Sequence, residues 1–328
     1  MKLKIKIPLV NLSMSIIPML GMACALYFMS IRSANEITQS KTESQLVSFR
    51  ELQGAQISHY FETIGKQAET LADNLMVIDA AEQLSNAFHA SDITLDPAHK
   101  NTLGTYYSQD FLTRYQEKNV GKTLDTNTLT QALNDQATYF QYHYIKANAN
   151  VLGEKHKLDA ANDNSRYSAI HSTVHPSLRH YLEAFGLYDI FIVDGASGDV
   201  IYTVFKEIDF ATNLNSGSFQ NTKLAETFKR IMASNDQNAL ISEFAAYPPS
   251  YEDAAAFIGA PIYKNGKKIA ALIFQLPIDR INNVMTNNNQ WEAKGLGKTG
   301  ESYLVGGDYL MRNQSRLLIT NKELFVTE

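Results

Sequence analysis

The sequence contains almost no cysteine. Cys24 is the only one among 328 residues, so no disulfide can form within the chain. This absence does not exclude an extracytoplasmic location. A chain of this length, with 45% hydrophobic residues, can bury one large core or two modest cores without disulfide support.

Basic residues are scarce beyond the first six positions. Lys2, Lys4 and Lys6 are three of the 29 basic residues, which leaves 26 basic against 34 acidic side chains and a formal charge of −8 for the rest of the chain. Nucleic-acid binding requires a basic face that neutralises phosphates, and none accumulates here. The composition therefore predicts no nucleic-acid partner.

Charged residues are absent from positions 7 to 31. As a helix this run spans roughly 37 Å, enough for a tilted crossing of a lipid bilayer. Three lysines before the run and only Arg32 directly after it predict a cytoplasmic tail at 1–6 and an external location for residues 33–328. The alternative is a cleaved signal peptide with its site at 23–25. The apolar run continues to Ile31, longer than a usual signal core, which favours an uncleaved anchor.

Proline is absent from residues 36 to 88, which also contain only two glycines. We therefore predict a long helix over residues 36–90. Apolar residues recur in it at alternating three- and four-residue steps: Ile57, Tyr60 or Phe61, Ile64, Ala68, Leu71, Leu75 and Ile78. This seam fits either a homodimer contact between two such helices or packing of the helix on its own sheet.

The remaining sequence shows helical patterns followed by paired strand patterns. Residues 91–102 are polar and predict a loop. Helices are expected over 103–117, 126–147, 174–185 and 224–233. Strands are expected over 188–193, 200–205, 257–263 and 268–275, and Asn265-Gly266 is a strong hairpin turn between the last two. This order predicts an α+β fold with an antiparallel sheet. A further helix is expected from Pro277 to Trp291 and a further strand over 301–305.

Two motifs suggest nucleotide or metal chemistry, but their contexts argue against it. The segment from Gly295 to Gly300 matches a glycine-rich fingerprint, yet polar residues precede it and a strand pattern follows it. His171 and His175 have the spacing of a helical metal pair, yet Pro176 disfavours an unbroken helix and no third ligand is evident. No catalytic triad order or close carboxylate pair stands out. We predict no catalytic residue, no metal and no cofactor, and hence no enzyme.

Residues 185 to 214 resemble the central sheet of the first Cache module in the extracytoplasmic sensor regions of bacterial transmembrane receptors. These receptors are chiefly methyl-accepting chemotaxis receptors and membrane-bound cyclases or kinases. Other matching pieces follow in the same order: Lys66-Gln67 with Leu71, Tyr106-Tyr107 with Phe111, Gln141-Tyr142 with Tyr144-Ile145, Gly153 with Lys155-His156, His171 with His175-Pro176 and Leu178-Arg179, Tyr247 with Pro249-Ser250-Tyr251, Phe274 through Ile281, and Gly295-Leu296-Gly297 through Met311-Arg312. The similarity covers most of residues 40 to 316. It departs in two loops, at Asn148–Val151, which lacks a usual proline, and at Gly217-Ser218-Phe219, where Gly-Pro-Tyr is usual.

The resemblance implies a domain order for the whole chain. A cytoplasmic tail (1–6) and a transmembrane helix (7–31) would lead into a signalling helix (36–90). A membrane-distal, PAS-like Cache sensor module (91–281) would follow, and then a linker helix with the incomplete start of a membrane-proximal module (282–328). The implied location is the bacterial inner membrane, with residues 33–328 in the periplasm. A return span and an output domain are not present in full, so we expect the front of a receptor or a truncated product.

The implied function is binding without chemistry. We expect a chemoreceptor sensor that binds a small polar molecule, including one that bears a carboxylate, and that contacts the lipid bilayer and a second copy of the chain. The expected ligand-binding residues are Tyr167, His171, Arg179, Tyr188, Asp189, Tyr202, Lys206 and Asp209. The sensor front end of a membrane-bound cyclase or histidine kinase fits the same pattern. A periplasmic metal-dependent hydrolase and a structural or adhesive protein are alternatives from other classes.

Overall fold

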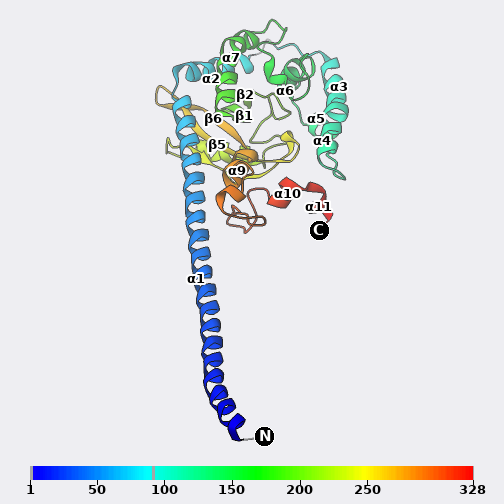
Figure 1. Cartoon of the computed structure of the whole chain (residues 1–328). Helices are drawn as coiled ribbons and strands as arrows, with labels where there is room; N and C mark the ends of the chain where they lie inside the picture. Colours follow the sequence, from blue (N-terminus) through cyan, green and yellow to red (C-terminus); the bar gives the residue numbers. More distant parts are fainter. Residues whose placement is uncertain (1–2, 91–92, 328) are drawn as a thin grey trace. The chain divides into compact units, whose positions relative to one another are not determined.

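The computed structural model describes residues 3–90 and 93–327. Contacts within the chain divide it into two units, Met1–Gln56 and Ile57–Glu328, and the boundary falls inside helix α1 (Leu3–Ala72). The second unit holds the sheet and the other helices (Figure 1).

The first unit is the amino-terminal part of α1. It provides the one helical stretch, among the residues that the structure describes, that is long and apolar enough to cross a membrane. Its most apolar window has a mean hydropathy of 1.8 and is unburied. Side chains from Val10 to Ile31 are exposed throughout. Residues 1 and 2 of the predicted 1–6 tail lie outside the described residues.

The helix predicted over 36–90 is interrupted. Helix α1 ends at Ala72, and α2 runs from Leu75 to Phe88. Asn74 begins the second helix, because its side-chain oxygen accepts a hydrogen bond from the amide of Met76 at 2.9 Å. A short polar side chain that competes for backbone amides stops one helix and starts another.

The apolar seam of the predicted helix packs within the second unit. Ile64, Ala68 and Leu71 are buried in the core of this unit. Leu75, which lies beyond the break, is 78% exposed. The packing on the chain's own sheet, one of the two arrangements considered for the seam, therefore accounts for residues 64 to 71.

The sheet is antiparallel and has the order β2-β1-β6-β5-β3, with β4 paired to β5. Its strands are β1 (Asp189–Asp194), β2 (Val200–Thr203), β3 (Leu240–Ile241), β4 (Ala245–Tyr247), β5 (Asp253–Lys264) and β6 (Lys267–Pro277). The two predicted hairpins are confirmed as β1-β2 and β5-β6. Asn265 and Gly266 form the second turn with φ of 51° and 74°, as a tight hairpin requires. The short strands β3 and β4 were not predicted.

Helices cover both faces of this sheet. Ile258 of β5 lies 3.5 Å from where a side chain would begin at Gly65 of α1. The next residue, Gly259, is approached by Ile231 of α8 (Lys223–Ala233). Successive residues of a strand point to opposite faces, so α1 and α8 lie on opposite sides of the sheet.

The helix predicted over 103–117 lies within a continuous helical run that is formed by α3 (Pro97–Thr105), a π-helical segment (Tyr106–Phe111) and α4 (Leu112–Lys118). The helix predicted over 126–147 is interrupted after α5 (Thr126–Gln131) and resumes as α6 (Asp135–Gln141) and a second π-helical segment (Tyr142–Lys146). The helix predicted over 224–233 is confirmed as α8, and α7 (Arg166–Phe185) begins earlier than predicted and continues through Pro176. Short 3₁₀ segments lie at Lys155–Lys157 and Pro248–Ser250. The loop predicted over 91–102 is wrong from Pro97 onward, because Asp96 caps α3 there.

The chain after the sheet also differs from the prediction. Helix α9 spans Ile278–Thr286 and does not reach Trp291, because residues 287–289 are three asparagines with φ of 52°, 55° and 64°. This left-handed backbone cannot continue a right-handed helix. The strand predicted over 301–305 is reduced to one bridge between Val305 and Met311. A 3₁₀ segment (Glu292–Lys294) and the short helices α10 (Arg316–Thr320) and α11 (Lys322–Thr327) complete the described chain.

Candidate functional site

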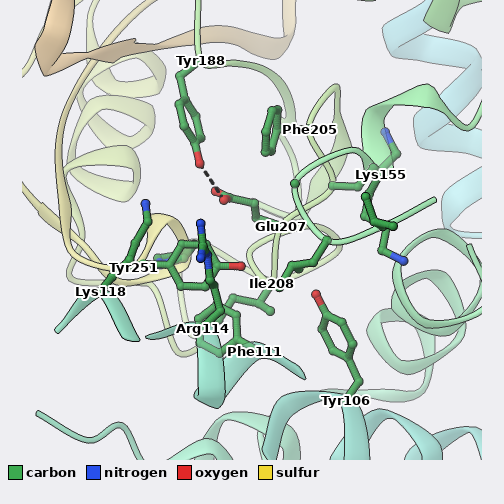
Figure 2. Close-up of a pocket in the computed structure, with 15 residues that line it drawn as sticks. Tyr106, Phe111, Arg114, Lys118, Lys155, Tyr188, Phe205, Glu207, Ile208 and Tyr251 are labelled. Atoms are coloured by element: carbon green, nitrogen blue, oxygen red, sulfur yellow. Dashed lines mark hydrogen bonds between the residues drawn. The ribbon is translucent and has the colours of Figure 1, made fainter. Parts of the chain in front are cut away.

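A cavity of about 400 Å³ lies between the helical run of residues 97–118, which we call the helical layer, and the end of the β1-β2 hairpin opposite its turn. The helical layer provides Tyr106, Phe111, Arg114 and Lys118, and a loop provides residues 151–153 and Lys155. The hairpin side provides Tyr188 and residues 205–208, and Pro249 and Tyr251 complete the wall. Figure 2 shows these side chains around the space.

Four basic residues line this cavity, namely Arg114, Lys118, Lys155 and Lys206, and Glu207 is its one acid. Arg114 lies 3.2 Å from Glu117 and Lys118 lies 2.5 Å from Asp253, so both are partly neutralised. Lys155 is buried, and its Nζ donates to the backbone oxygen of Asn148 at 2.7 Å. Burial and the neighbouring Lys146 lower the pKa of Lys155. The wall therefore offers positive charge to an anionic ligand.

Glu207 is the one acidic residue that lines the cavity, and two hydroxyl groups donate hydrogen bonds to its carboxyl group. The hydroxyl of Tyr188 donates to one of its carboxyl oxygens at 2.8 Å (Figure 2). Ser250 Oγ donates to the other at 2.7 Å. Gln275 Nε2 in turn donates to Ser250 Oγ at 2.9 Å. Burial, together with the nearby Asp209, raises the pKa of Glu207 well above its ordinary value.

Lys206 forms part of the wall, but its ammonium group points into an aromatic cage. Its Nζ donates to the backbone oxygen of Thr203 and lies 4.6 Å from the centre of the Tyr202 ring. The rings of Phe210 and Tyr144 follow at 5.2 Å and 5.6 Å. Such rings stabilise a cation. Burial nevertheless lowers the pKa of Lys206 to about 7, although Asp189 opposes the shift.

Asp189 organises the backbone behind the wall. One of its carboxyl oxygens accepts the amides of Ile190, Val204 and Phe205 at 2.7, 2.8 and 2.9 Å. The carboxyl is fully buried, and burial together with Asp209 raises its pKa to about 7. This single side chain therefore ties the end of β2 to the start of β1.

Asp209 lies in the same region and is also fully buried. It accepts a hydrogen bond from the hydroxyl of Tyr247 at 2.6 Å. Burial raises its pKa to about 6, and this hydrogen bond offsets part of the shift.

The structure divides the eight predicted binding residues into three groups. Tyr188 and Lys206 line the cavity. Asp189, Asp209 and Tyr202 lie behind it, buried and in contact with its wall through the interactions above. The remaining three, Tyr167, His171 and Arg179, are on α7 and do not line the cavity. Their role in binding stays a prediction.

The side chains of α7 instead hold the loop that leads to the cavity. His171 bonds the backbone oxygen of Asp159 at 2.6 Å, and His175 bonds that of His156 at 2.6 Å and the hydroxyl of Tyr202 at 2.8 Å. Arg179 donates to the oxygen of His156 at 3.1 Å and to the carboxylate of Asp159 at 2.7 Å. These contacts fix residues 156–159, directly after Lys155 of the cavity wall.

The metal and nucleotide motifs find no supporting geometry. Within residues 3–90 and 93–327, no group of three or more His, Cys, Asp or Glu side chains could hold a metal ion. Burial lowers the pKa of both His171 and His175, and their stacked rings lie 4.4 Å apart. The glycine-rich segment Gly295–Gly300 follows a 3₁₀ turn and opens no helix.

Four charged residues of the cavity were not among the predicted binding residues. Arg114 and Lys118 lie on α4, Lys155 lies in a 3₁₀ segment, and Glu207 follows Lys206. The pieces that carried the family resemblance contained several cavity residues, namely Tyr106, Phe111, Gly153, Lys155, Pro249 and Tyr251. Their joint appearance in the resemblance was the signal that could have located the site.

Comparisons with known proteins return sensor domains. The sensor domain of the V. cholerae histidine kinase DctB matches at a TM-score of 0.28 and 14% identity over 56% of this chain, and the match spans 59% of that domain. The sensory domain of the Campylobacter jejuni chemoreceptor Tlp3 (CcmL) with isoleucine bound matches at a TM-score of 0.30 and 12% sequence identity, and the match covers 78% of this chain and 76% of that domain. The ligand-binding domain of the Pseudomonas fluorescens chemoreceptor CtaA in complex with L-serine matches at a TM-score of 0.31 and 12% sequence identity, and the match covers 69% of this chain and 70% of that domain.

The other two comparisons give no match. No protein-family profile matches the sequence, and no curated protein matches it. The solved structures above are sensory and ligand-binding domains, the class of protein that the resemblance in the sequence names.

Proposed function

We propose that this chain is the ligand-sensing part of a bacterial transmembrane receptor and that its cavity binds a small polar molecule with at least one carboxylate. The observation that carries the proposal is the charge of the cavity wall. Arg114, Lys118 and Lys155 contribute three cations to a space of about 400 Å³, and Glu207 is its one acid. A carboxylate satisfies an arginine through two parallel hydrogen bonds, and the tyrosine and phenylalanine rings suit a small apolar remainder.

Binding without reaction agrees with the environment of the acid. Both oxygens of Glu207 already accept hydrogen bonds from hydroxyl groups, so neither oxygen is free to take a proton from a substrate. A ligand would act by favouring one of two conformations of the wall. Residues 7–31 would anchor the chain in the inner membrane with residues 33–328 outside, and α1 would pair with that of a second copy. This arrangement of a membrane anchor and an external sensor fits a chemoreceptor, a histidine kinase and a cyclase equally.

A binding screen tests the proposal. The full chain in detergent micelles is titrated calorimetrically with small carboxylates, comprising dicarboxylates and the amino acids named in the neighbouring structures. We expect saturable binding of at least one compound. Arg114→Ala and Lys155→Met should each weaken it by roughly 10- to 100-fold, because each removes a charge-assisted hydrogen bond.

Lys122→Ala is the matched control, since Lys122 is exposed and does not line the cavity. It should leave the affinity unchanged. Equal affinities in Arg114→Ala, Lys155→Met and the wild type would contradict the assignment of the cavity. The absence of binding by every compound would contradict the proposed ligand class.

A further inference from the structure

Four buried ionisable side chains lie in the cavity wall or directly behind it, and we name Asp189, Lys206, Glu207 and Asp209 the buried charge cluster. Their exposed fractions are 0%, 1%, 9% and 0%. Three acids share this space with one base. Ionised carboxylates are costly to bury without a compensating charge. The cluster therefore needs positive charge beyond that of Lys206.

Buried oxygen atoms that lack a hydrogen-bond donor show where this positive charge is missing. Asp189 Oδ2, Asp209 Oδ1 and Gln275 Oε1 are buried and accept no hydrogen bond of good geometry. Asp189 and Gln275 are direct partners in the register of β1 and β6. A protonated carboxyl group carries an O–H donor, whereas an ionised one can only accept. One bound proton would therefore both lower the negative charge and supply a donor among these atoms.

A ligand cation is the less suitable source of the missing charge. Neither Asp189 nor Asp209 lines the cavity, and both oxygens of Glu207 are occupied by Tyr188 and Ser250. A proton needs no space. We propose that the buried charge cluster binds and releases a proton as the external pH changes, so that the chain reads pH at the floor of its ligand cavity.

The histidines and tyrosines that face the buried charge cluster have pKa values shifted away from neutral pH. The groups that titrate there are therefore members of the cluster itself. From α7, burial and Lys206 lower the pKa of His171 and His175, which keeps both neutral. Arg179 on the same helix remains paired with Asp159. Tyrosines face it from the other elements, and burial raises the pKa of every one: Tyr106 and Tyr107 from the first π-helical segment, Tyr144 from the second, Tyr188 before β1, Tyr202 from β2, Tyr247 from β4 and Tyr251 after Pro248–Ser250.

The pKa values of three cluster members lie close to neutral pH, which agrees with proton binding by the cluster. Burial brings the pKa of Asp189 up to about 7 and that of Lys206 down to about 7, and it raises that of Asp209 to about 6. The amides of residues 209 and 210 and the hydroxyl of Tyr247 limit the shift of Asp209. Proton exchange in the cluster therefore falls near neutral pH.

Residues 204–211 link the protonation state of Asp189 to the wall of the cavity. The carboxylate of Asp189 accepts the amides of Val204 and Phe205 at the start of this segment. Lys206 and Ala211 within it have φ of 63° and 62°, a conformation that is strained for residues other than glycine. Hydrogen bonds to a charged acceptor are roughly twice as strong as those to a neutral one. Protonation of Asp189 thus loosens a strained segment whose residues 205–208 form the cavity wall.

Infrared spectroscopy tests this inference without any ligand, so its failure is distinguishable from failure of the proposed function. The full chain in detergent micelles is titrated from about pH 8 to about pH 5, and the carbonyl stretch of protonated carboxyl groups is followed. We expect a band that grows as the pH falls through about 7 and about 6. Asp209→Asn should remove part of this band, and Asp236→Asn, at an exposed turn, should leave it intact.

Two results would overturn the inference: no titrating band in this range, or a band unchanged in both Asp189→Asn and Asp209→Asn. Circular dichroism confirms that each variant is folded. If both fail to fold, Tyr247→Phe decides the question, because it removes only the hydroxyl that lowers the pKa of Asp209. The band of this variant should move to higher pH, and an unmoved band would contradict the inference.

Discussion

Glu207 and Tyr188 show at the level of single residues how the cavity is built. The tyrosine hydroxyl donates to a carboxyl oxygen of the buried Glu207 at 2.8 Å. We predict that Tyr188→Phe lowers the free energy of unfolding by about 1 kcal/mol, because a buried acceptor loses its donor. Chemical denaturation of the full chain in detergent measures the change.

Tyr181→Phe is a matched control for this variant. Tyr181 is half-buried on α7, and its ring contacts Phe185 and Phe274. The loss of its hydroxyl should change the free energy of unfolding by only a few tenths of a kcal/mol. Equal losses in the two variants would show that the Tyr188 hydrogen bond contributes nothing specific.

His89 provides a pH-dependent contribution outside the cavity. Its Nε2 lies 3.0 Å from a carboxyl oxygen of Asp199, and this hydrogen bond raises the pKa of His89. A group with a raised pKa in the folded state stabilises fully below its ordinary pKa and loses that contribution as the pH rises through the folded pKa. His89→Gln should therefore cost about 1 kcal/mol more at about pH 5.5 than at about pH 8.5, after allowance for solvent screening.

Thermal or chemical unfolding of the wild type and His89→Gln at these two values of pH measures the difference. Asp199 lies at the turn end of the β1-β2 hairpin, whereas Asp189 lies at the opposite end of β1. The difference in unfolding free energy between the wild type and His89→Gln therefore reports mainly on the His89–Asp199 pair. A loss of stability that is the same at both values would mean that the imidazole is not charged when paired with Asp199.

The residues that line the cavity were predicted only where the sequence keeps them close together. Tyr188 and Lys206 come from one hairpin whose strands and turn are local features. Arg114 and Lys155 reach the same cavity from segments far apart in the sequence. Neither periodicity nor turn chemistry contains the tertiary contact that brings them together, so no local pattern could assign them.

At the level of elements, Asn74 illustrates why a uniform helical pattern failed. The periodic apolar positions continue from Leu71 to Leu75, yet the asparagine side chain caps a new helix. We predict that Asn74→Ala lowers the free energy of unfolding by about 1 kcal/mol, the usual value of an N-cap. Asn74→Asp, which keeps an accepting oxygen, should retain the wild-type value.

Denaturant unfolding of these two variants gives the result. If Asn74→Ala were as stable as Asn74→Asp, the break between α1 and α2 would not depend on this cap. The two hairpins were predicted more successfully than the helix boundaries, because runs of β-branched and aromatic residues and an Asn-Gly turn are features of neighbouring residues. The π-helical segments at Tyr106–Phe111 and Tyr142–Lys146 carry an extra residue per turn, which an apolar period near 3.6 does not reveal.

At the level of the whole molecule, the apolar amino-terminal helix should determine where the chain resides. Residues 10–31 are exposed throughout, are mostly apolar and contain no charged side chain. We predict that the full chain stays in the membrane fraction after alkaline extraction. A Leu20→Arg substitution should weaken insertion by about 3 kcal/mol, because it places a charge in the middle of the span. Extraction of the wild type into the soluble fraction would contradict a membrane anchor.

We place the ligand site in the cavity between the helical layer and the β1-β2 hairpin. Hydrogen–deuterium exchange of the full chain, with and without a carboxylate from the binding screen, tests this location. We predict that the ligand slows exchange in residues 106–118, 151–155 and 204–208, which surround the cavity, and leaves α7 unchanged. Protection of α7 or of residues 300–314, without any change in the three cavity segments, would contradict the account.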